Sequence, residues 1–342
     1  MSRTLLGSLA LLAILPTMNI AADETPVPGV VLGIHGGTAS GKKSLTPELA
    51  DALRADLRRS LEAGYTVWKA SDASSLDAVE AAIHVLEDSP HFNAGRGAIF
   101  TRSGRNELDA SIMDGRTKQG GAVGFVTTIK NPISAARAVM EQSKHVLLVG
   151  PGAEQFAESC GLETVDPSYF RTEPRWQQHQ RDLKREAEQT TSGGKIETDR
   201  SEKQPWSTVG AVALARAGDL AAGTSTGGTS NKLFGRLGDS PILGAGTYAD
   251  NASCAVSGTG HGEYFIRFAV AYDIGALMKY RGKDVAEAAA EVIHDKLKPA
   301  GGNGGVIALD AKGNFAAPYN TEGMYRGWVT RDGTITVHLY ED

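Results

Sequence analysis

The sequence predicts an α+β fold in which packed β-sheets are flanked by helices. The chain has 342 residues and is 41% hydrophobic, which provides enough material for a large core. Segments typical of strands and of helices come in blocks rather than in strict alternation, which argues against a doubly wound parallel sheet. A long polar stretch separates two halves, and each half carries both strands and a pair of helices.

The first half begins with a buried strand over residues 30–34 that ends in His35-Gly36-Gly37. Thr46 and Pro47 predict the start of a helix, since threonine caps helix N-termini and proline suits the first turn. Leucines recur every fourth residue from Leu49 to Leu61 and form one apolar face. Further along we expect a helix over about 76–86, three strands within 98–129 with turns at 103–104 and 114–115, a helix from Asn131-Pro132, a strand over 145–150 and a short helix over 152–162.

The second half follows a polar run over residues 171–203. This run is rich in Lys, Arg, Glu and Gln and has almost no aliphatic residues, so we expect a solvated loop. After it, the pattern predicts hairpin strands at 208–215 and 220–225, helices at 262–280 and 284–297, a hairpin at 304–320 and a last strand at 334–340.

The first 22 residues resemble a secretory signal. Arg3 precedes an apolar run, and Ala21-Ala22 offers a cleavage site, so a secreted or periplasmic location is expected. The alternative, a membrane anchor, is disfavoured because the run is short and Pro16 interrupts it. The net charge of −5 gives no reason to expect nucleic acid or anionic lipid as a partner. Cys160 and Cys254 could pair, or both could be buried free thiols.

Several familiar motifs are absent or incomplete. GGTASGKKS (36–44) nearly matches a phosphate-binding loop, but Lys43 stands where a magnesium-binding hydroxyl belongs. GAGTYA (244–249) lacks the helix that follows a dinucleotide fingerprint. There is no H-E-x-x-H, no paired C-x-x-C and no G-x-S-x-G, which argues against a catalytic zinc and an esterase-type serine.

Two sets of charged residues remain as candidates for a site. Glu107 and Asp109 share one face of a strand, so they could serve a carboxylate mechanism, or they could anchor turns and bind basic side chains. Arg236 and Asp239 could hold the carboxylate and the ammonium of an α-amino acid. A surface ion pair is the alternative, but the glycine-rich sequence on both sides favours a site.

Seven stretches together resemble the plant-type asparaginases, also called isoaspartyl peptidases, which are N-terminal nucleophile hydrolases. They occur in the family's order from about Val30 to about Trp328: IHGGTAS, HFNAGRGAIFT, ELDASIMDG, STVGAVAL, AAGTSTGGTSNKLFGRLGDSPILGAGTYA, SGTGHGE and YNTEGMYRGW. The resemblance implies a four-layer αββα sandwich. It also implies that the precursor cuts its own chain between Ser207 and Thr208.

Cleavage there would release the threonine as the nucleophile of a second subunit. The resemblance thus implies an α subunit over 23–207, with a polar linker over about 166–207, and a β subunit over 208–342. The two form one catalytic domain and assemble as (αβ)2. The new terminal amine, with a pKa of about 7.7–8.0 when unperturbed, can accept the hydroxyl proton. Many relatives have glycine where this chain has Ser207, and a side chain there is expected to slow cleavage.

The resemblance also assigns roles to individual residues. Thr226 orients the nucleophile, Thr259 and Gly260 form the oxyanion site, and Asn93 positions the scissile carbonyl. Arg236 and Asp239 hold the substrate's α-carboxylate and α-ammonium, in a site that includes Thr259, Gly260 and Gly262. A structural Na⁺ in some relatives corresponds to backbone carbonyls of Leu86, Glu87, Ser89, Phe92, Ala94 and Arg96, and catalysis needs no cofactor.

The function expected from these residues is hydrolysis of β-aspartyl amides, in isoaspartyl dipeptides and in L-asparagine, through an ester on Thr208. A glycosylasparaginase of the same superfamily is the alternative, and an uncleaved amino-acid-binding protein is a third reading. The leaving group, whether ammonia, an amino acid or a sugar, stays open.

Overall fold

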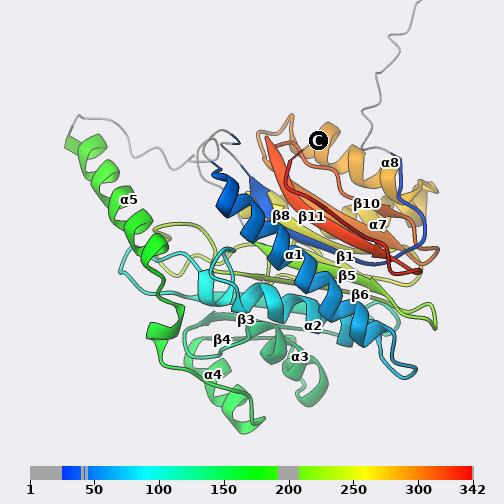
Figure 1. Ribbon diagram of the computed structural model, residues 1–342, viewed down its shortest axis with the longest axis horizontal. Helices are drawn as coiled ribbons and strands as arrows, with labels where there is room; N and C mark the ends of the chain where they lie inside the picture. The colour runs from blue at the N-terminus through cyan, green and yellow to red at the C-terminus, as the bar shows by residue number, and fades with distance from the viewer. Residues whose placement is uncertain (1–24, 40–41, 43–44, 192–207, 341–342) are drawn as a thin grey trace, which may run out of the picture.

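The chain forms four layers, in the order helices, sheet, sheet, helices (Figure 1). The computed structural model describes residues 25–39, 42, 45–191 and 208–340. The first sheet has eight strands in the order β12-β11-β1-β5-β6-β2-β3-β4, and the second has four in the order β10-β9-β8-β7. The neighbours pair antiparallel except β3 and β4, which are parallel. The predicted α+β sandwich is confirmed.

The bounds of the elements are as follows. The first sheet contains β1 (Val30–Ala39), β2 (Leu108–Asp114), β3 (Gly120–Val126), β4 (Leu147–Val149), β5 (Val209–Leu214), β6 (Leu220–Thr226), β11 (Gly323–Thr330) and β12 (Ile335–His338). The second contains β7 (Thr247–Ala249), β8 (Cys254–Gly260), β9 (Gly304–Asp310) and β10 (Phe315–Ala316). The helices are α1 (Pro47–Trp68), α2 (Ser75–Asp88), α3 (Pro132–Gln142), α4 (Gly150–Ser159), α5 (Glu173–Thr191), α6 (Gly262–Phe268), α7 (Val270–Arg281) and α8 (Val285–Ala290). Two short 3₁₀ helices, η3 (Gly95–Gly97) and η4 (Pro167–Phe170), and a π-helix, η5 (Glu291–Leu297), complete the set among the described residues.

Strand β5 shows how the sequence forms two cores. Val209, Ala211 and Ala213 face the core shared with α1 to α4, whereas Val212 and Leu214 face the core between the sheets. Because side chains alternate across a strand, both faces must be apolar for a strand buried in the middle of four layers. The run TVGAVAL meets that requirement. Thr208, the residue just before β5, therefore lies at the edge of the core.

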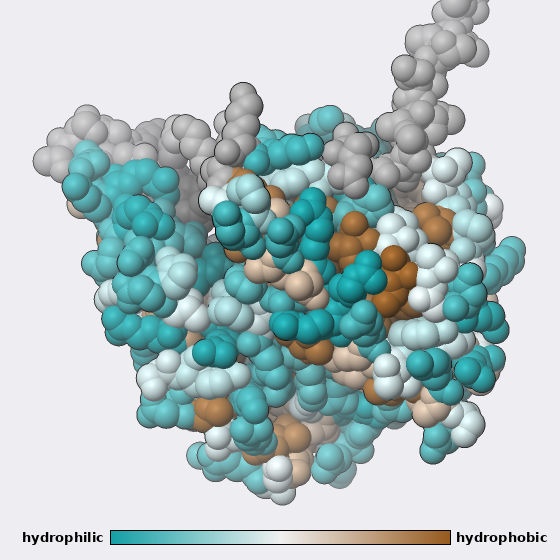
Figure 2. Space-filling view, viewed as in Figure 1, coloured by the Kyte–Doolittle hydropathy of each residue, from teal (hydrophilic) through white to brown (hydrophobic). Residues whose placement is uncertain are grey.

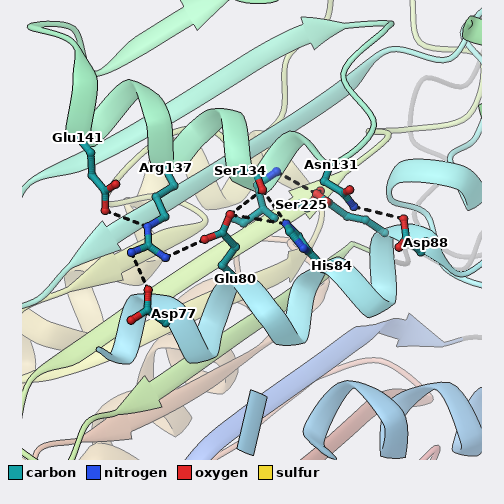
Figure 3. A network of polar contacts seen from close by, with 11 residues as sticks. Asp77, Glu80, His84, Asp88, Asn131, Ser134, Arg137, Glu141 and Ser225 are labelled. Carbon is teal, nitrogen blue, oxygen red and sulfur yellow. Dashed lines mark hydrogen bonds and ion pairs between the residues drawn. The ribbon is translucent and has the colours of Figure 1, made fainter. Parts of the chain in front are cut away.

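The helices on the outer face begin as the sequence predicts. Thr46 accepts a hydrogen bond from the backbone N–H of Leu49, and Ser74 forms a capping box with Asp77. Arg137 on α3 joins α3 to α2 by ion pairs to Asp77 and Glu80, both on α2 (Figure 3). The helical layer is therefore held by charged contacts at its surface as well as by its apolar face.

Three predicted elements are wrong in detail. The expected strand at the start of 98–129 is absent, since only β2 and β3 form there. The helix predicted over 262–280 is two helices, broken at Ala269, whose φ of 46° is left-handed. Strand β1 runs on through His35-Gly36-Gly37 to Ala39. Strands β7, β8 and β11 lie in stretches for which the sequence analysis predicted no strand.

The expected solvated loop before Thr208 is wrong for residues 173–191, which form helix α5. Figure 1 shows α5 in green, standing beside the layers rather than within them. His179, Asp182 and Glu186 are buried on the face that contacts the body of the protein. The remainder of the predicted linker, residues 192–207, lies outside the described residues, as do the predicted signal and Ser207.

Surface properties agree with the composition. Figure 2 shows a mostly hydrophilic face, with apolar side chains gathered in small patches beside α1. Within the described residues no helix is long and apolar enough to cross a membrane. Cys160 and Cys254 are both free thiols, and burial raises the pKa of the Cys254 thiol to about 12.

Candidate active site

Thr208 lies beside Thr226 because of the strand register. β5 and β6 pair antiparallel with Val209 opposite Ser225, so the next position places Thr208 opposite Thr226. The two hydroxyl oxygens are 3.0 Å apart. Thr226 Oγ1 also accepts the backbone N–H of Gly228 at 3.0 Å, which fixes the hydroxyl on the side of Thr208. The pair predicted from the sequence is thus in hydrogen-bond contact.

A buried carboxyl holds the strand that carries Thr226. Ser225 donates its hydroxyl to Glu87 Oε1 at 2.6 Å, and the same oxygen accepts the backbone N–H of Ile133 on α3. Burial raises the pKa of Glu87 to about 8. Figure 3 shows Ser225 reaching toward the layer formed by α2 and α3. The end of β6 is therefore fixed from the helical side.

Asn93 lies next to the turn that follows β6. Its Nδ2 donates to Gly228 O at 2.7 Å, and its Oδ1 accepts from the backbone N–H of Ile99 at 3.0 Å. A Cβ on Gly227 would lie 2.5 Å from Asn93 Oδ1, so only glycine allows this approach. The structure thus brings Asn93 to the Thr226 turn, and the carbonyl it is expected to position belongs to Ser207.

Thr259 and Gly260 lie at the end of β8 in the second sheet. Thr259 is fully buried, and within the described parts of the chain its Oγ1 has no hydrogen-bond partner. Gly260 has a φ of +146°, and a Cβ there would lie 2.4 Å from Asn303 O. An unpaired buried donor is costly unless a ligand completes it, which suits a site for a negatively charged oxygen.

A small pocket joins these residues to the predicted clamp. It is lined by Thr208, Thr226, Gly228, Thr229, Arg236, Gly238, Asp239, Ser240 and Gly260. Five of the residues singled out from the sequence therefore share one pocket, although they come from β6, β8 and two loops. Gly262 packs against the clamp, since a Cβ there would lie 2.8 Å from both Arg236 Nη2 and Asp239 Oδ1.

Arg236 is held by a residue that the sequence analysis quoted but did not assign. Its Nε and Nη2 donate to the two oxygens of Glu263 at 2.9 and 3.0 Å. In this bidentate pairing Arg236 Nη1 makes no bond to Glu263 and lies near Gly238. A Cβ added to Gly238 would be 2.9 Å from Arg236 Nη1. Glu263 thus orients the guanidinium with Nη1 toward the pocket. No local pattern signals this pair, because its members are 27 residues apart.

Asp239 is the least satisfied charge in the pocket. Burial raises its pKa to about 7, and the positive charge of Arg236 only partly offsets this. Its Oδ2 is buried with no hydrogen-bond partner among the residues described. An ammonium ion bound here would supply the missing partner and favour the ionised carboxylate.

Beneath Thr208 lies a buried polar network that the sequence analysis missed. His35 Nε2 is 2.9 Å from Ser257 Oγ, which is 2.7 Å from Thr224 Oγ1. Thr224 Oγ1 in turn accepts from Thr247. Burial lowers the pKa of His35 to about 3, so the ring is neutral near pH 7. The sequence pattern that could have predicted this network is the presence of hydroxyl residues on the inner face of otherwise apolar strands.

Glu107, just before β2, and Asp109, within it, have a structural role. Lys232 Nζ lies 3.6 Å from Asp109 Oδ2 and 3.9 Å from Glu107 Oε2, with the lysine side chain buried. Asp109 Oδ1 also accepts the backbone N–H of Phe125. Of the two readings left open, binding of a basic side chain is the one that the geometry supports.

The predicted sodium loop has the close backbone packing that a ring of carbonyls needs. A Cβ on Gly95 would lie 2.3 Å from Glu87 O, and one on Gly97 would lie 2.1 Å from Phe92 O. The Arg96 guanidinium lies over the Tyr169 ring, 5.8 Å from its centroid. The loop is therefore closely packed against the carbonyls of Glu87 and Phe92, and the positive side chain of Arg96 contacts an aromatic ring.

A threonine hydroxyl beside an inner strand of an αββα sandwich defines the class of N-terminal nucleophile hydrolases. A sequence profile of the family described as Asparaginase matches residues 28–339. The chain belongs to this family. It is similar to the isoaspartyl peptidase of Escherichia coli, 49% identical over 317 residues that cover 91% of this chain and 96% of the relative.

Two relatives from distant organisms are also similar to this chain. The isoaspartyl peptidase/L-asparaginase of Mus musculus is 41% identical over 298 residues, covering 86% of each chain. The plant-type L-asparaginase of Pyrococcus abyssi is 41% identical over 299 residues, covering 86% of this chain and 94% of the relative. The resemblance stated from the seven stretches is confirmed.

Proposed function

We propose that the protein is a threonine-type amidohydrolase that cleaves β-aspartyl amide bonds, in isoaspartyl dipeptides and in L-asparagine. The observation that carries the proposal is the pocket itself, in which the Thr208–Thr226 hydroxyl pair lies with Arg236 and Asp239. An α-carboxylate and an α-ammonium bound to that clamp leave the β-carbonyl of an aspartyl group as the part that meets Thr208.

The chain is activated by its own Thr208. The hydroxyl attacks the carbonyl of Ser207, an ester replaces the peptide bond and frees the Thr208 amine, and water then hydrolyses the ester to release the Ser207 carboxyl and the Thr208 hydroxyl. Asn93 holds the turn at Gly228, which lines the same pocket as Thr208. Once freed, the amine has an unperturbed pKa of about 7.7–8.0, so it can accept the proton of the Thr208 hydroxyl in the turnover that follows.

Turnover repeats this chemistry on the substrate. Thr208 Oγ1 attacks the β-carbonyl, and Thr259 Oγ1 and the backbone of Gly260 stabilise the negative oxygen. The amine of Thr208 passes the proton to the departing nitrogen, which leaves a β-aspartyl ester on Thr208. Water, deprotonated by the same amine, hydrolyses the ester and releases aspartate.

A sodium ion at the carbonyls of Leu86, Glu87, Ser89, Phe92, Ala94 and Arg96 would have a structural role, because it would fix the loop that carries Asn93. No chemical step involves it. We further propose an (αβ)2 assembly and export of the protein. Export rests on residues 1–22 alone.

The function is tested by intact-mass analysis together with turnover of three substrates assayed side by side: an isoaspartyl dipeptide, L-asparagine and glycosylasparagine. We expect two fragments meeting between Ser207 and Thr208, and turnover of the first two substrates. Preference for glycosylasparagine would favour the glycosylasparaginase alternative. One uncut chain that binds amino acids without turnover would favour a binding protein.

Arg236→Lys is expected to lower kcat/KM by roughly 10- to 150-fold, the cost of about one charge-assisted hydrogen bond. A lysine keeps the charge but cannot contact Glu263 and a substrate carboxylate through a planar fork. The loss should be equal for L-asparagine and the isoaspartyl dipeptide, since both present the same aspartyl half. Arg267→Lys, an exposed arginine of α6, is the control. A loss on only one substrate would place Arg236 on the leaving-group side.

A further inference from the structure

Helix α5 packs on the loop that carries Asn93. The ring centroids of Trp176 and His179 lie 5.2 and 5.5 Å from that of Phe100. Arg175 is partly buried, and its Nε donates to Gly97 O at 2.9 Å. A helix with so little apolar surface gains stability mainly from such tertiary contacts, so α5 exists because it docks here.

The same helix binds the loop after β6. We name residues Thr229–Lys232 the pocket loop, because Thr229 lines the pocket. Asn231 has both ends of its amide engaged by α5: its Oδ1 lies 2.7 Å from His179 Nδ1, and its Nδ2 donates to Glu186 Oε1 at 2.9 Å. Ser230 donates to Asp182 Oδ2 at 2.9 Å.

These contacts are buried and specific. Asn231 and Glu186 are each 6% exposed, and Asp182 is 5% exposed. Asn231 also has a φ of 54°, a left-handed conformation that asparagine tolerates better than most residues. Buried polar groups of this kind are costly unless paired, so each holds its partner in place.

The partners of the pocket loop come from the part of the chain before Thr208. Lys232 Nζ donates to Glu107 O at 3.1 Å, and the Asn231 backbone N–H donates to Phe100 O at 2.9 Å. After cleavage, the pocket loop belongs to the C-terminal fragment, whereas α5, Phe100 and Glu107 belong to the N-terminal fragment. No covalent bond would then join the two sides of these contacts, so the contacts alone would hold α5 against the pocket loop.

We propose that α5 is a positioning helix for the substrate pocket: His179, Asp182 and Glu186 fix Ser230 and Asn231, and thereby set the wall formed by Thr229. This inference rests on the proposed function. The helix touches no reacting atom, so its effect should appear in substrate binding rather than in the chemical step. Self-cleavage, which occurs at Thr208, should proceed without it.

Asn231→Asp tests the contact with almost no change in shape. A carboxylate there loses the donor to Glu186 and places two negative charges together. We expect fully cleaved variant to show a KM raised roughly 10- to 100-fold, the range for a displaced positioning group, with a smaller change in kcat. Hydrogen exchange of a peptide covering residues 228–232 should quicken. Adding Glu186→Gln restores a donor opposite the new carboxylate and should return both readouts toward wild type.

Gln177→Glu is the matched control, because Gln177 is exposed on the same helix and donates to Glu173 at 2.9 Å. It should change neither readout. Wild-type KM and wild-type exchange in Asn231→Asp would overturn the proposal, as would failure of Glu186→Gln to rescue it. If the wild-type protein showed no turnover, the proposed function would be contradicted instead. The hydrogen-exchange data would then test only whether α5 holds the pocket loop in place.

Discussion

Thr208→Ala is expected to leave one uncut chain with no measurable turnover of β-aspartyl substrates. Alanine lacks the hydroxyl that attacks both the Ser207 carbonyl and the substrate, so both reactions stop at their first step. Loss of a nucleophile costs roughly 10⁴-fold or more in kcat. The fold should survive, because among the described residues Thr208 Oγ1 has one side-chain hydrogen-bond partner, Thr226, and the change removes only a few atoms. Denaturing gels and a turnover assay measure the two outcomes.

Thr208→Ser is the matched control. Serine retains the hydroxyl and, after cleavage, the amine, so fragments and partial activity are expected. Wild-type turnover by uncut Thr208→Ala protein would exclude Thr208 as the nucleophile. Fragments forming in that variant would mean that another group, or another protease, cuts the chain.

Asp239→Asn is expected to have opposite effects on activity and on stability. The pKa of Asp239 is about 7 in the folded protein against an ordinary value of 3.8, since burial disfavours the charge. The folded state therefore binds the proton more tightly than the unfolded state. The stability that protonation provides is complete below pH 3.8 and is lost as the pH rises through 7.

At pH 8 the buried Asp239 carboxylate should thus destabilise the fold. The neutral side chain of Asn at position 239 should remove this loss of stability. We expect a gain of about 2–4 kcal/mol in the free energy of unfolding at pH 8, shrinking to near zero at pH 4. Catalysis should fall roughly 10- to 150-fold in kcat/KM, because the substrate ammonium loses its carboxylate.

Urea unfolding of fully cleaved protein at pH 4, 6 and 8 measures the stability, with exposed Asp72→Asn as the control. A gain in the free energy of unfolding that grows as the pH falls would contradict the raised pKa of Asp239. Unchanged kcat/KM would show that Asp239 does not contact the ammonium. The combined outcome, a more stable and less active protein, is typical of a charge retained for function.

Local signals in the sequence were enough for a large part of the fold. Caps and periodic apolar residues predicted the starts of α1 and α3, and the apolar run from Thr208 predicted β5. These elements were predictable because the signals that mark them, a capping residue or a burial pattern, are written along the strand or helix itself. The residues of the pocket were found as members of quoted stretches, and the register of β5 and β6 then placed Thr208 opposite Thr226.

Contacts between distant residues decided what the sequence analysis missed. The polar run before Thr208 gave no apolar periodicity, yet residues 173–191 are helical because Phe100, Ser230 and Asn231 receive their side chains. Glu263 looks like an ordinary helix-start acid until the fold brings Arg236 against it. The sequence by itself determined the layered α+β architecture and the family, and through the resemblance it predicted Thr208 as the nucleophile and Arg236 and Asp239 as the clamp. Only the tertiary structure decided which charges meet, because a polar side chain becomes a specific contact only when the fold removes water from it and supplies one partner.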